Sequence, residues 1–325
     1  MKLINTVQNA KHRLAAPLAG LPAVKLTKTT LQQNRFNAEL QARSLCKLAE
    51  SIQPDILFTM MDLSLEAASL GLPVRYPPDE SATIEHHPVK YAADLEKFKA
   101  VDLLYDGRVW VALETTRRLS RQIDIPVAAY IVSPFTLAGL MMGAGEIAIA
   151  ALDSPEQVQL ILTFCEHVSL SYAKAQLNAG AGILCFLDPT AAMLSPDAYR
   201  EFAGNSQRNV IQQINAQTML HICGDTTHLI GSMCETGVQG LSLDAAVDLY
   251  ETAQRVPDDM VVIGNIDPVQ VMLNGTVETV RDAVQELTEK TRDLNNVIFS
   301  TGCDLPAKTP IENIAEFVRI VHAPS

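Results

Sequence analysis

The chain has 325 residues, of which 48% are hydrophobic and 19% charged, and its formal net charge is −12. This is the composition of a globular protein with a sizeable core, and the acidic balance argues against nucleic acid or an anionic membrane surface as a partner. Six cysteines are scattered along the chain, unlike those of a small disulfide-bonded secreted domain, so we expect a reducing, cytoplasmic location.

The N-terminal part of the chain predicts two strands and one long helix. Residues 1–50 open with a mixed polar segment, and residues 21–28 predict a first strand. Apolar residues at helical spacing predict an amphipathic helix over residues 37–52. The apolar run at residues 55–60 predicts the second strand, which leads to Asp62.

Residues 71–100 are rich in proline and charge and show no clear period. We therefore expect a long excursion after the second strand. A helix is predicted at residues 107–123, and the uncharged stretch 125–145 begins as a strand that turns at Ser133. Two prolines and several glycines interrupt that stretch, which argues against a membrane span.

The second half of the chain alternates short apolar runs with helical patterns. Ser154-Pro-Glu and Leu194-Ser-Pro-Asp carry the N-cap and first-turn residues that begin helices. The whole chain then contains eight strand candidates, centred near Val24, Leu57, Ala129, Leu184, Leu220, Leu241, Val262 and Ile298.

Apolar strands that alternate with helices predict an α/β fold with a parallel sheet covered on its outer face. Eight such units predict that residues 1–325 form a single (β/α)8 TIM barrel, with a helical N-terminal extension and the excursion as an insertion. The alternative is an open doubly wound sheet. Neither G-x-G-x-x-G nor G-x-x-x-x-G-K-[ST] occurs, which lowers the expectation of a nucleotide-binding sheet.

Two segments carry soft metal ligands at predicted strand ends. In the extended run Met219-Leu-His-Ile-Cys-Gly-Asp225, His221 and Cys223 share one face of the strand. Cys303 lies at the end of another strand, in Ser300-Thr-Gly-Cys-Asp304. Two thiolates and one imidazole favour zinc over magnesium or calcium, and three protein ligands leave one position open for chemistry.

Other polar residues follow the strands at the same predicted end, where barrel enzymes place their active sites. Asp244 is a candidate for a displaceable fourth ligand, and its alternative role is that of a helix N-cap before Ala245. The alternative role is that of a helix-capping loop for Asp188 and of a backbone-orienting amide for Asn265. The candidate substrate-binding residues are Asp62, Ser133, Asp188 and Asn265.

Four motifs stand at or after the predicted strand ends: Leu187-Asp-Pro-Thr-Ala-Ala-Met-Leu-Ser-Pro-Asp197, His221-Ile-Cys-Gly224, Gly264-Asn-Ile266 and Thr301-Gly-Cys-Asp-Leu-Pro-Ala-Lys-Thr-Pro-Ile-Glu-Asn313. They resemble the uroporphyrinogen decarboxylase superfamily, and within it the zinc methyltransferases that move a methyl group from a methylated corrinoid to coenzyme M. The resemblance implies a (β/α)8 barrel with zinc held by His221, Cys223 and Cys303. It also implies that Asp244 stands where those enzymes commonly carry a glutamate that ligates zinc when no thiol is bound.

The function that the resemblance implies is transfer of a methyl group from a methylcobamide to a zinc-bound small thiol, the catalytic nucleophile being the thiolate. No D-x-H-x-x-G corrinoid-binding motif occurs in the chain, so the methylcobamide is expected on a partner corrinoid protein. The acceptor thiol stays open between coenzyme M, homocysteine and another thiol.

Two alternatives remain. The first is decarboxylation of a tetrapyrrole, for which Asp62 lies near the decarboxylases' catalytic aspartate. However, the chain lacks their arginine-rich N-terminal segment and has Gly302-Cys303 in place of their Gly-His-Gly type of sequence. The second is a non-enzymatic barrel with a structural zinc.

Overall fold

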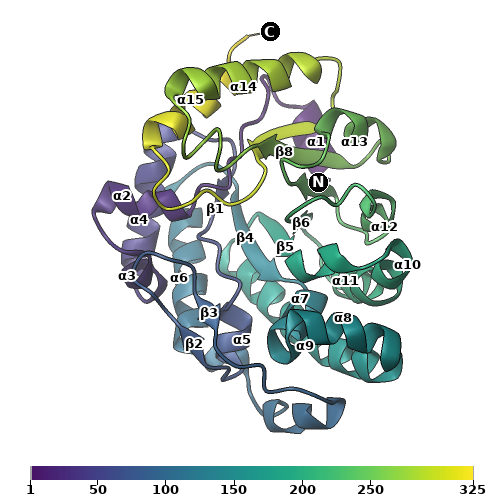
Figure 1. Cartoon of the computed structure of the whole chain (residues 1–325). Coiled ribbons are helices and arrows are strands. Elements are labelled where there is room, and N and C mark those ends of the chain that lie inside the picture. The colour runs from purple at the N-terminus through teal and green to yellow at the C-terminus, as the bar shows by residue number, and fades with distance from the viewer. Residues whose placement is uncertain (1, 325) are drawn as a thin grey trace.

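The computed structural model describes residues 2–324, and it shows a curled parallel sheet with helices on its outer side (Figure 1). Each strand of this sheet pairs in parallel with the next one in the order β1-β4-β5-β6-β7-β8-β9. The predicted α/β class with a parallel sheet is thus confirmed. The strands are β1 (Leu57–Phe58), β4 (Val127–Val132), β5 (Ile183–Leu187), β6 (Gln217–Ile222), β7 (Gly240–Leu243), β8 (Val261–Ile266) and β9 (Val297–Thr301).

The strand predicted at residues 21–28 is wrong. This stretch forms the 3-10 helix η1 (Leu21–Ala23) and the helix α2 (Val24–Thr27). Pro22 lies in the first turn of η1, where the N–H that proline lacks would have no helical partner in any case. The other seven predicted strands are present.

An extended segment earlier in the chain bridges the two edges of the sheet. Phe299 of β9 exchanges two backbone hydrogen bonds with residues 14–18, at 2.8 and 2.9 Å. Asp55, two residues before β1, donates its N–H to Ala15 O at 2.8 Å. This closing segment, residues 14–18, therefore contacts β9 and the residue two positions before β1 through its backbone.

Helices cover the outer side of the sheet, and the long predicted helices are all present. The α-helices not yet given are α1 (Leu3–Gln8), α3 (Leu31–Arg35), α4 (Ala38–Ile52), α5 (Leu65–Ser69), α6 (Gly107–Gln122), α7 (Pro134–Met142), α8 (Ala144–Asp153), α9 (Pro155–Ala179), α10 (Pro196–Ala198), α11 (Asn205–Ile211), α12 (Ile230–Cys234), α13 (Leu249–Arg255), α14 (Val277–Lys290) and α15 (Ile311–Val321). Shorter turns are the 3-10 helices η2 (Ala92–Phe98), η3 (Leu103–Tyr105) and η4 (Pro189–Met193), and the π-helix η5 (Tyr199–Gly204).

The excursion at residues 71–100 has some structure of its own. It contains the antiparallel pair β2 (Val74–Arg75) and β3 (Thr83–Ile84), followed by η2. Polar contacts attach the hairpin to α3: Gln32 Nε2 donates to Tyr76 O at 2.9 Å and Gln32 N donates to Pro78 O at 3.0 Å. The excursion is therefore anchored over the N-terminal helices.

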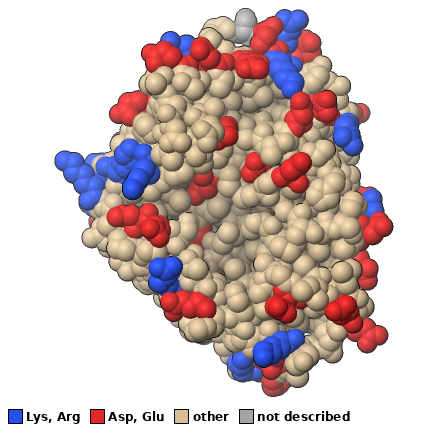
Figure 2. Space-filling view, in the orientation of Figure 1, with Lys and Arg blue, Asp and Glu red and all other residues tan. Residues whose placement is uncertain are grey.

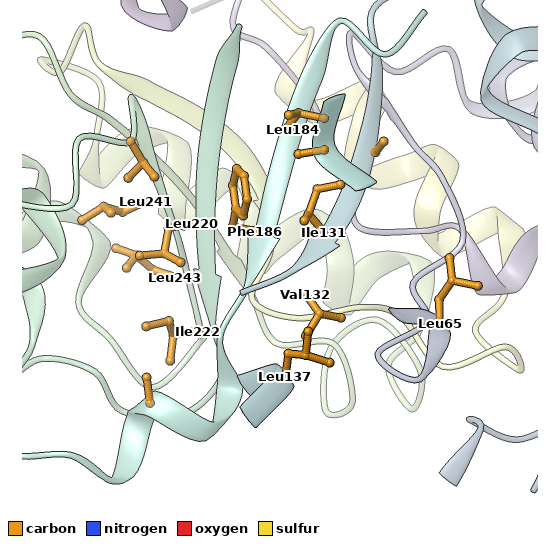
Figure 3. Close-up of a cluster of buried hydrophobic side chains, with 14 of the residues drawn as sticks. Leu65, Ile131, Val132, Leu137, Leu184, Phe186, Leu220, Ile222, Leu241 and Leu243 are labelled. Carbon is orange, nitrogen blue, oxygen red and sulfur yellow. The ribbon is translucent and has the colours of Figure 1, made fainter. Parts of the chain in front are cut away.

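The two faces of the sheet bury different side chains, because successive residues of a strand alternate in direction. Leu220 and Ile222 of β6 belong to the outer core, between sheet and helices (Figure 3). Met219 belongs to the inner core, inside the curl, together with Leu3 of α1. His221, two residues after Met219, therefore faces the inside of the sheet at its C-terminal end.

Among residues 2–324, no single helix is both long and apolar enough to cross a bilayer, and α7 with α8 reaches that composition only as a pair bent by 105°. One face of the molecule is hollowed near its centre (Figure 2). Acidic side chains lie in and around the hollow on this face, whereas lysines and arginines lie toward the rim (Figure 2).

Candidate metal centre and substrate pocket

Three predicted ligands, His221, Cys223 and Cys303, come together at the C-terminal end of the sheet. Their ligand atoms lie within 4.8 Å of one another. His221 Nε2 is 3.2 Å from Cys223 Sγ, and the two sulfurs are 3.1 Å apart, both cysteines being free thiols. His221 and Cys223 come from the end of β6 and Cys303 from the loop after β9, so eighty residues of chain separate the two halves of the group.

Ser242 orients the imidazole. Its hydroxyl on β7 lies 3.0 Å from His221 Nδ1, and both side chains are buried. When the ring proton is on Nδ1, it is donated to Ser242 and the Nε2 lone pair is left toward the sulfurs. Strand register explains the contact, since His221 pairs directly with Ser242. The sequence analysis did not single out Ser242, although a serine within an apolar strand beside the His-x-Cys strand was a usable signal.

Two glycines let the loops approach the sulfurs. Gly224 follows Cys223 with φ +87°, a left-handed conformation that favours glycine and turns the chain directly after the ligand. A Cβ on Gly302 would collide with the backbone nitrogen of Ala245, so only glycine lets the loop that carries Cys303 pack against the loop after β7.

Asp244 lies beside the group but is not one of its three ligand residues. Its carboxylate accepts the backbone N–H groups of Gly224 at 2.9 Å and Ala246 at 3.0 Å. Asn265 Nδ2 donates to Asp244 O at 2.9 Å and to Val247 O at 2.6 Å. In this arrangement Asp244 and Asn265 hold the backbone of the turn, and the zinc-ligand role of Asp244 stays a prediction.

The two thiols influence each other's ionisation. The hydrogen bond from Cys223, joined by one from His221, holds the pKa of Cys303 below that of an ordinary thiol, although burial opposes the shift. The same contact with Cys303, with burial, raises the pKa of Cys223. The first thiolate of the pair therefore forms on Cys303, next to a neutral thiol and an imidazole.

Two buried polar groups near the thiols have no hydrogen-bond partner within the described part of the chain. They are Oδ1 of Asp304 and the hydroxyl of Tyr130. Burial, and then the neighbouring Cys303, raise the pKa of Asp304 well above its usual range. Burial, and then Asp304, raise the pKa of Tyr130. Neither was predicted as a site residue, and Tyr130, inside an apolar strand, has the pattern of a core residue.

Asp188 and Ser133 lie at the ends of neighbouring strands, as predicted from their positions after β5 and β4. Asp188 is fully buried, and its Oδ1 accepts the N–H (3.0 Å) and the hydroxyl (2.7 Å) of Thr136. Its other oxygen and the Ser133 hydroxyl are buried without a partner in residues 2–324. Burial raises the pKa of Asp188 to about 7.

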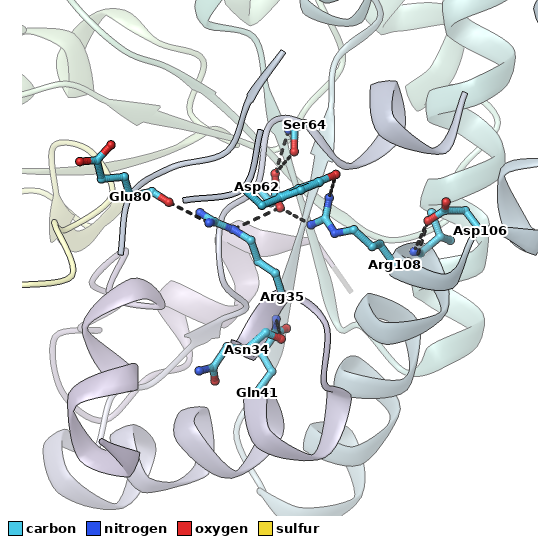
Figure 4. Close-up of polar contacts among 10 residues, drawn as sticks. Asn34, Arg35, Gln41, Asp62, Ser64, Glu80, Asp106 and Arg108 are labelled. Atoms are coloured by element: carbon cyan, nitrogen blue, oxygen red, sulfur yellow. Dashed lines mark hydrogen bonds and ion pairs between the residues drawn. The ribbon is translucent and has the colours of Figure 1, made fainter. Parts of the chain in front are cut away.

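Asp62 lies apart from the thiols and pairs with two arginines (Figure 4). Its Oδ2 forms an ion pair with Arg108 and lies 3.5 Å from Arg35 Nε, while its Oδ1 accepts the N–H and the hydroxyl of Ser64. Asp62 and the two arginines line a cavity whose wall also includes Tyr130 and residues of β4 and β5. Asp62 was predicted as a site residue from its place after a strand, whereas no sequence motif marks the two arginines.

A second group of metal-type ligands lies at the start of β1, opposite the strand ends that carry the thiols. Asp55 Oδ1 lies 2.8 Å from His12 Nε2, and Asp55 Oδ2 lies 2.8 Å from His322 Nε2. The same Oδ2 accepts the backbone N–H of Ala15 at 2.7 Å. These contacts tie the start of β1 to the closing segment and to the end of α15.

The comparisons with known proteins agree with this architecture. The family model described as uroporphyrinogen decarboxylase (URO-D) matches residues 21–324. A methylcobamide:CoM methyltransferase of Methanosarcina acetivorans is 30% identical over 322 residues, covering 93% of each chain. A uroporphyrinogen decarboxylase of Pseudoalteromonas translucida is 26% identical, covering 86% of this chain and 84% of its own.

Among solved structures, a methyltransferase from Methanosarcina mazei superposes with a TM-score of 0.89 at 21% identity, over 98% of this chain and 96% of its own. The family match and the relative at 30% identity both span most of the chain and confirm the resemblance that the sequence motifs predict. The chain therefore belongs to the uroporphyrinogen decarboxylase family.

Proposed function

We propose that the protein is a zinc-dependent methyltransferase that moves a methyl group from a methylated corrinoid to a small thiol such as coenzyme M. The observation that carries the proposal is the convergence of His221, Cys223 and Cys303 at the C-terminal end of the sheet. The similarity to a methylcobamide:CoM methyltransferase over 93% of both chains supports it.

The donor set fits a catalytic zinc ion. Two sulfurs and one imidazole nitrogen are the ligand types that zinc prefers, and three protein ligands leave a position for substrate. Ser242 fixes the imidazole, and the lowered pKa of Cys303 makes a thiolate available. A zinc ion bound here would lower the pKa of an incoming thiol and hold it as a thiolate.

The surrounding residues would orient the substrates. We take the fold as a closed (β/α)8 barrel in which the closing segment holds the position of the eighth strand, with the active site at the C-terminal strand ends. Asp188, Ser133 and Asp62 would line the substrate site from β5, β4 and the loop after β1. Asp244 would either ligate the metal before the thiol arrives or, with Asn265, keep the turn beside Cys223 in place.

The methyl donor would be carried by a separate corrinoid protein that docks at the mouth of the barrel. In the transfer the thiolate sulfur would form the new S–C bond as the cobalt–carbon bond breaks, and the corrinoid would keep the bonding electron pair. The chain's contribution is to hold the sulfur in line with the methyl group and exclude water from it.

Methylcobalamin serves as a free donor to test this function. We expect about one zinc per chain and demethylation of methylcobalamin by 2-mercaptoethanesulfonate, followed by absorbance. Cys303→Ala should lose the zinc and at least about 100-fold in rate, because the site then keeps only two protein ligands. Cys46→Ser is the matched control, since that free thiol lies on α4 and contacts Gln122.

The two alternative functions predict different results for the same protein samples. A decarboxylase would convert uroporphyrinogen to coproporphyrinogen after complete removal of metal. A barrel with a purely structural zinc would unfold on chelation and show no transfer with any thiol. Full transfer activity in Cys303→Ala would contradict the proposed mechanism.

A further inference from the structure

The cavity beside Asp62 contains two arginines and only one carboxylate to oppose them. The side chains of Arg35 and Arg108 are 4% and 10% exposed, and both pair with Asp62. The other acidic residue of the cavity, Glu66, is buried, and burial raises the pKa of its carboxyl to about 8, so near pH 7 it is mostly neutral. The cavity thus has one buried positive charge in excess, in a chain whose net charge is −12.

An excess buried charge is costly unless an opposite charge meets it. Arg108 Nε is buried and has no hydrogen-bond partner among residues 2–324, and the same holds for the hydroxyl of Tyr130, which lines the same cavity. Two donors of one cavity therefore lack an acceptor. The excess positive charge and the two donors without an acceptor both indicate that the cavity binds an anionic group.

The arginines are held in position before any ligand arrives (Figure 4). Arg35 donates to Glu80 O at 2.7 Å, and Arg108 donates to the Tyr76 hydroxyl at 2.8 Å. The Arg108 guanidinium also stacks against the rings of Tyr76 and Phe36, at 4.6 and 5.4 Å from their centroids. The excursion, which supplies Tyr76 and Glu80, thus builds one side of the cavity and fixes the two cations.

The cavity lies next to the metal centre in the sheet. Val132 and Leu187, which line it, are paired in register with each other, and Leu187 is paired with His221. Adjacent strands are about 4.8 Å apart, so the wall at Val132 is roughly 10 Å from His221 along the hydrogen-bonding direction. Tyr130 belongs both to the cavity wall and to the inner core beneath the thiols.

We infer that Arg35 and Arg108 bind the acidic group, sulfonate or carboxylate, at the far end of the thiol substrate. The inference rests on the proposed function, because it assumes that a thiol places its sulfur at His221, Cys223 and Cys303. It narrows the acceptor to small thiols that carry a negative charge. Asp62 then opposes one of the two positive charges and leaves the other for the substrate.

Three thiols with the same two-carbon chain test the inference: 2-mercaptoethanesulfonate, 3-mercaptopropionate and 2-mercaptoethanol. With methylcobalamin as donor, we expect the unaltered protein to favour at least one anionic thiol over the neutral one by about tenfold or more in kcat/KM, because charge-assisted hydrogen bonds are formed only with the anion. Comparison of the two anionic thiols shows whether the protein prefers a sulfonate or a carboxylate. A preference for 2-mercaptoethanol would overturn the inference.

Variants separate binding of the acidic group from a structural role. In Arg108→Gln we expect the ratio of kcat/KM for the anionic thiol to that for the neutral thiol to fall about tenfold or more, through KM for the anionic thiol. Arg121→Gln is the control, because Arg121 is exposed in the last turn of the same helix α6. An equal loss with all three thiols would show that Arg108 is only structural.

Asp62→Asn should change the affinity for an anion in the opposite direction. It also tests the inference if Arg108→Gln does not fold. Removing the opposing carboxylate should tighten binding of ethanesulfonate or propionate, which contain no thiol, in calorimetric titrations. Weaker binding in Asp62→Asn, or no binding of either anion to the unaltered protein, would contradict the inference. These titrations need no methyl transfer, so a failure of the proposed function would leave anion binding intact and the two results distinguishable.

Discussion

At the scale of single residues, the proposed metal centre involves a serine as well as the two cysteines. Ser242 is the only hydrogen-bond partner found for His221 Nδ1 in the described chain, and strand register brings the two together. Partners of this kind fix the tautomer and direction of a metal-bound imidazole.

Ser242→Ala should therefore weaken zinc binding about 10- to 100-fold without removing a ligand. Competition with a chelator of known affinity measures the change. Ser171→Ala, at an exposed position of α9, is the control and should bind zinc like the unaltered protein. Equal zinc affinity in both variants would mean that Ser242 does not orient His221.

The sequence identified the three converging ligands because each stands in a short motif at a strand end. Ser242, Tyr130 and Arg108 have no such motif. Ser242 and Tyr130 have the sequence pattern of residues within apolar strands, and Arg108 has that of one of several arginines on an exposed helix. Their roles follow from strand register and from the packing of the excursion, which single-sequence patterns do not specify.

At the scale of elements, the short helix α5 is joined to the sheet through a buried carboxyl group. Glu66 Oε1 accepts the Val132 N–H of β4 at 2.8 Å, and the side chain is 1% exposed. Burial raises the pKa of Glu66 from 4.5 to about 8. The folded protein therefore holds a proton that the unfolded chain releases between these pH values.

Stability should fall as pH rises from about 4.5 to about 8, because in that window the folded state binds more protons than the unfolded state. For one proton the slope is roughly 1.4 kcal/mol per pH unit. Glu66→Gln keeps an acceptor for Val132 and has no proton to lose, so urea unfolding from pH 5 to 8 should show a shallower decline. A decline as steep as that of the unaltered protein would contradict this role.

The structure of two segments was not predicted correctly from the sequence. Residues 21–28 have the alternation of a strand, yet the N-terminal packing and Pro22 make them helical. The closing segment contains Pro17 and two alanines, Ala15 and Ala16, and it joins the sheet through an isolated bridge rather than a regular ladder. It therefore shows no period of two, whereas the seven ladder strands are mostly apolar runs that the sequence reveals.

At the scale of the whole molecule, one carboxylate joins three distant parts of the chain. Asp55 binds His12, the closing segment at Ala15 and His322 after α15. The side chain is 17% exposed, so these hydrogen bonds are partly shielded from water.

Asp55→Ala should lower the free energy of unfolding by about 1 to 3 kcal/mol, since it leaves the Ala15 N–H and two imidazoles without their acceptor. Urea denaturation followed by circular dichroism measures the loss. Asp124→Ala is the control, because Asp124 is an exposed aspartate that lines the same surface pocket as Asp55, and it should change stability by less than about 0.5 kcal/mol. Zinc content should be equal in both variants, because the metal centre lies at the other end of the sheet.

The closing segment also determines when the protein can finish folding during its synthesis. Ser300 Oγ donates to Ala16 O across 284 residues, and β9 is the last strand of the sheet to be made. At about 5 to 20 residues per second, the ribosome needs roughly 14 to 57 seconds to make that length of chain. Residues 14–18 can pair with Asp55 as soon as both are made, but their other partner, Phe299 of β9, is still missing. Until then the growing edge of the sheet stays unpaired, and open edges pair readily with other chains. The nascent protein therefore passes through a long interval in which a chaperone that covers strand edges would raise its yield.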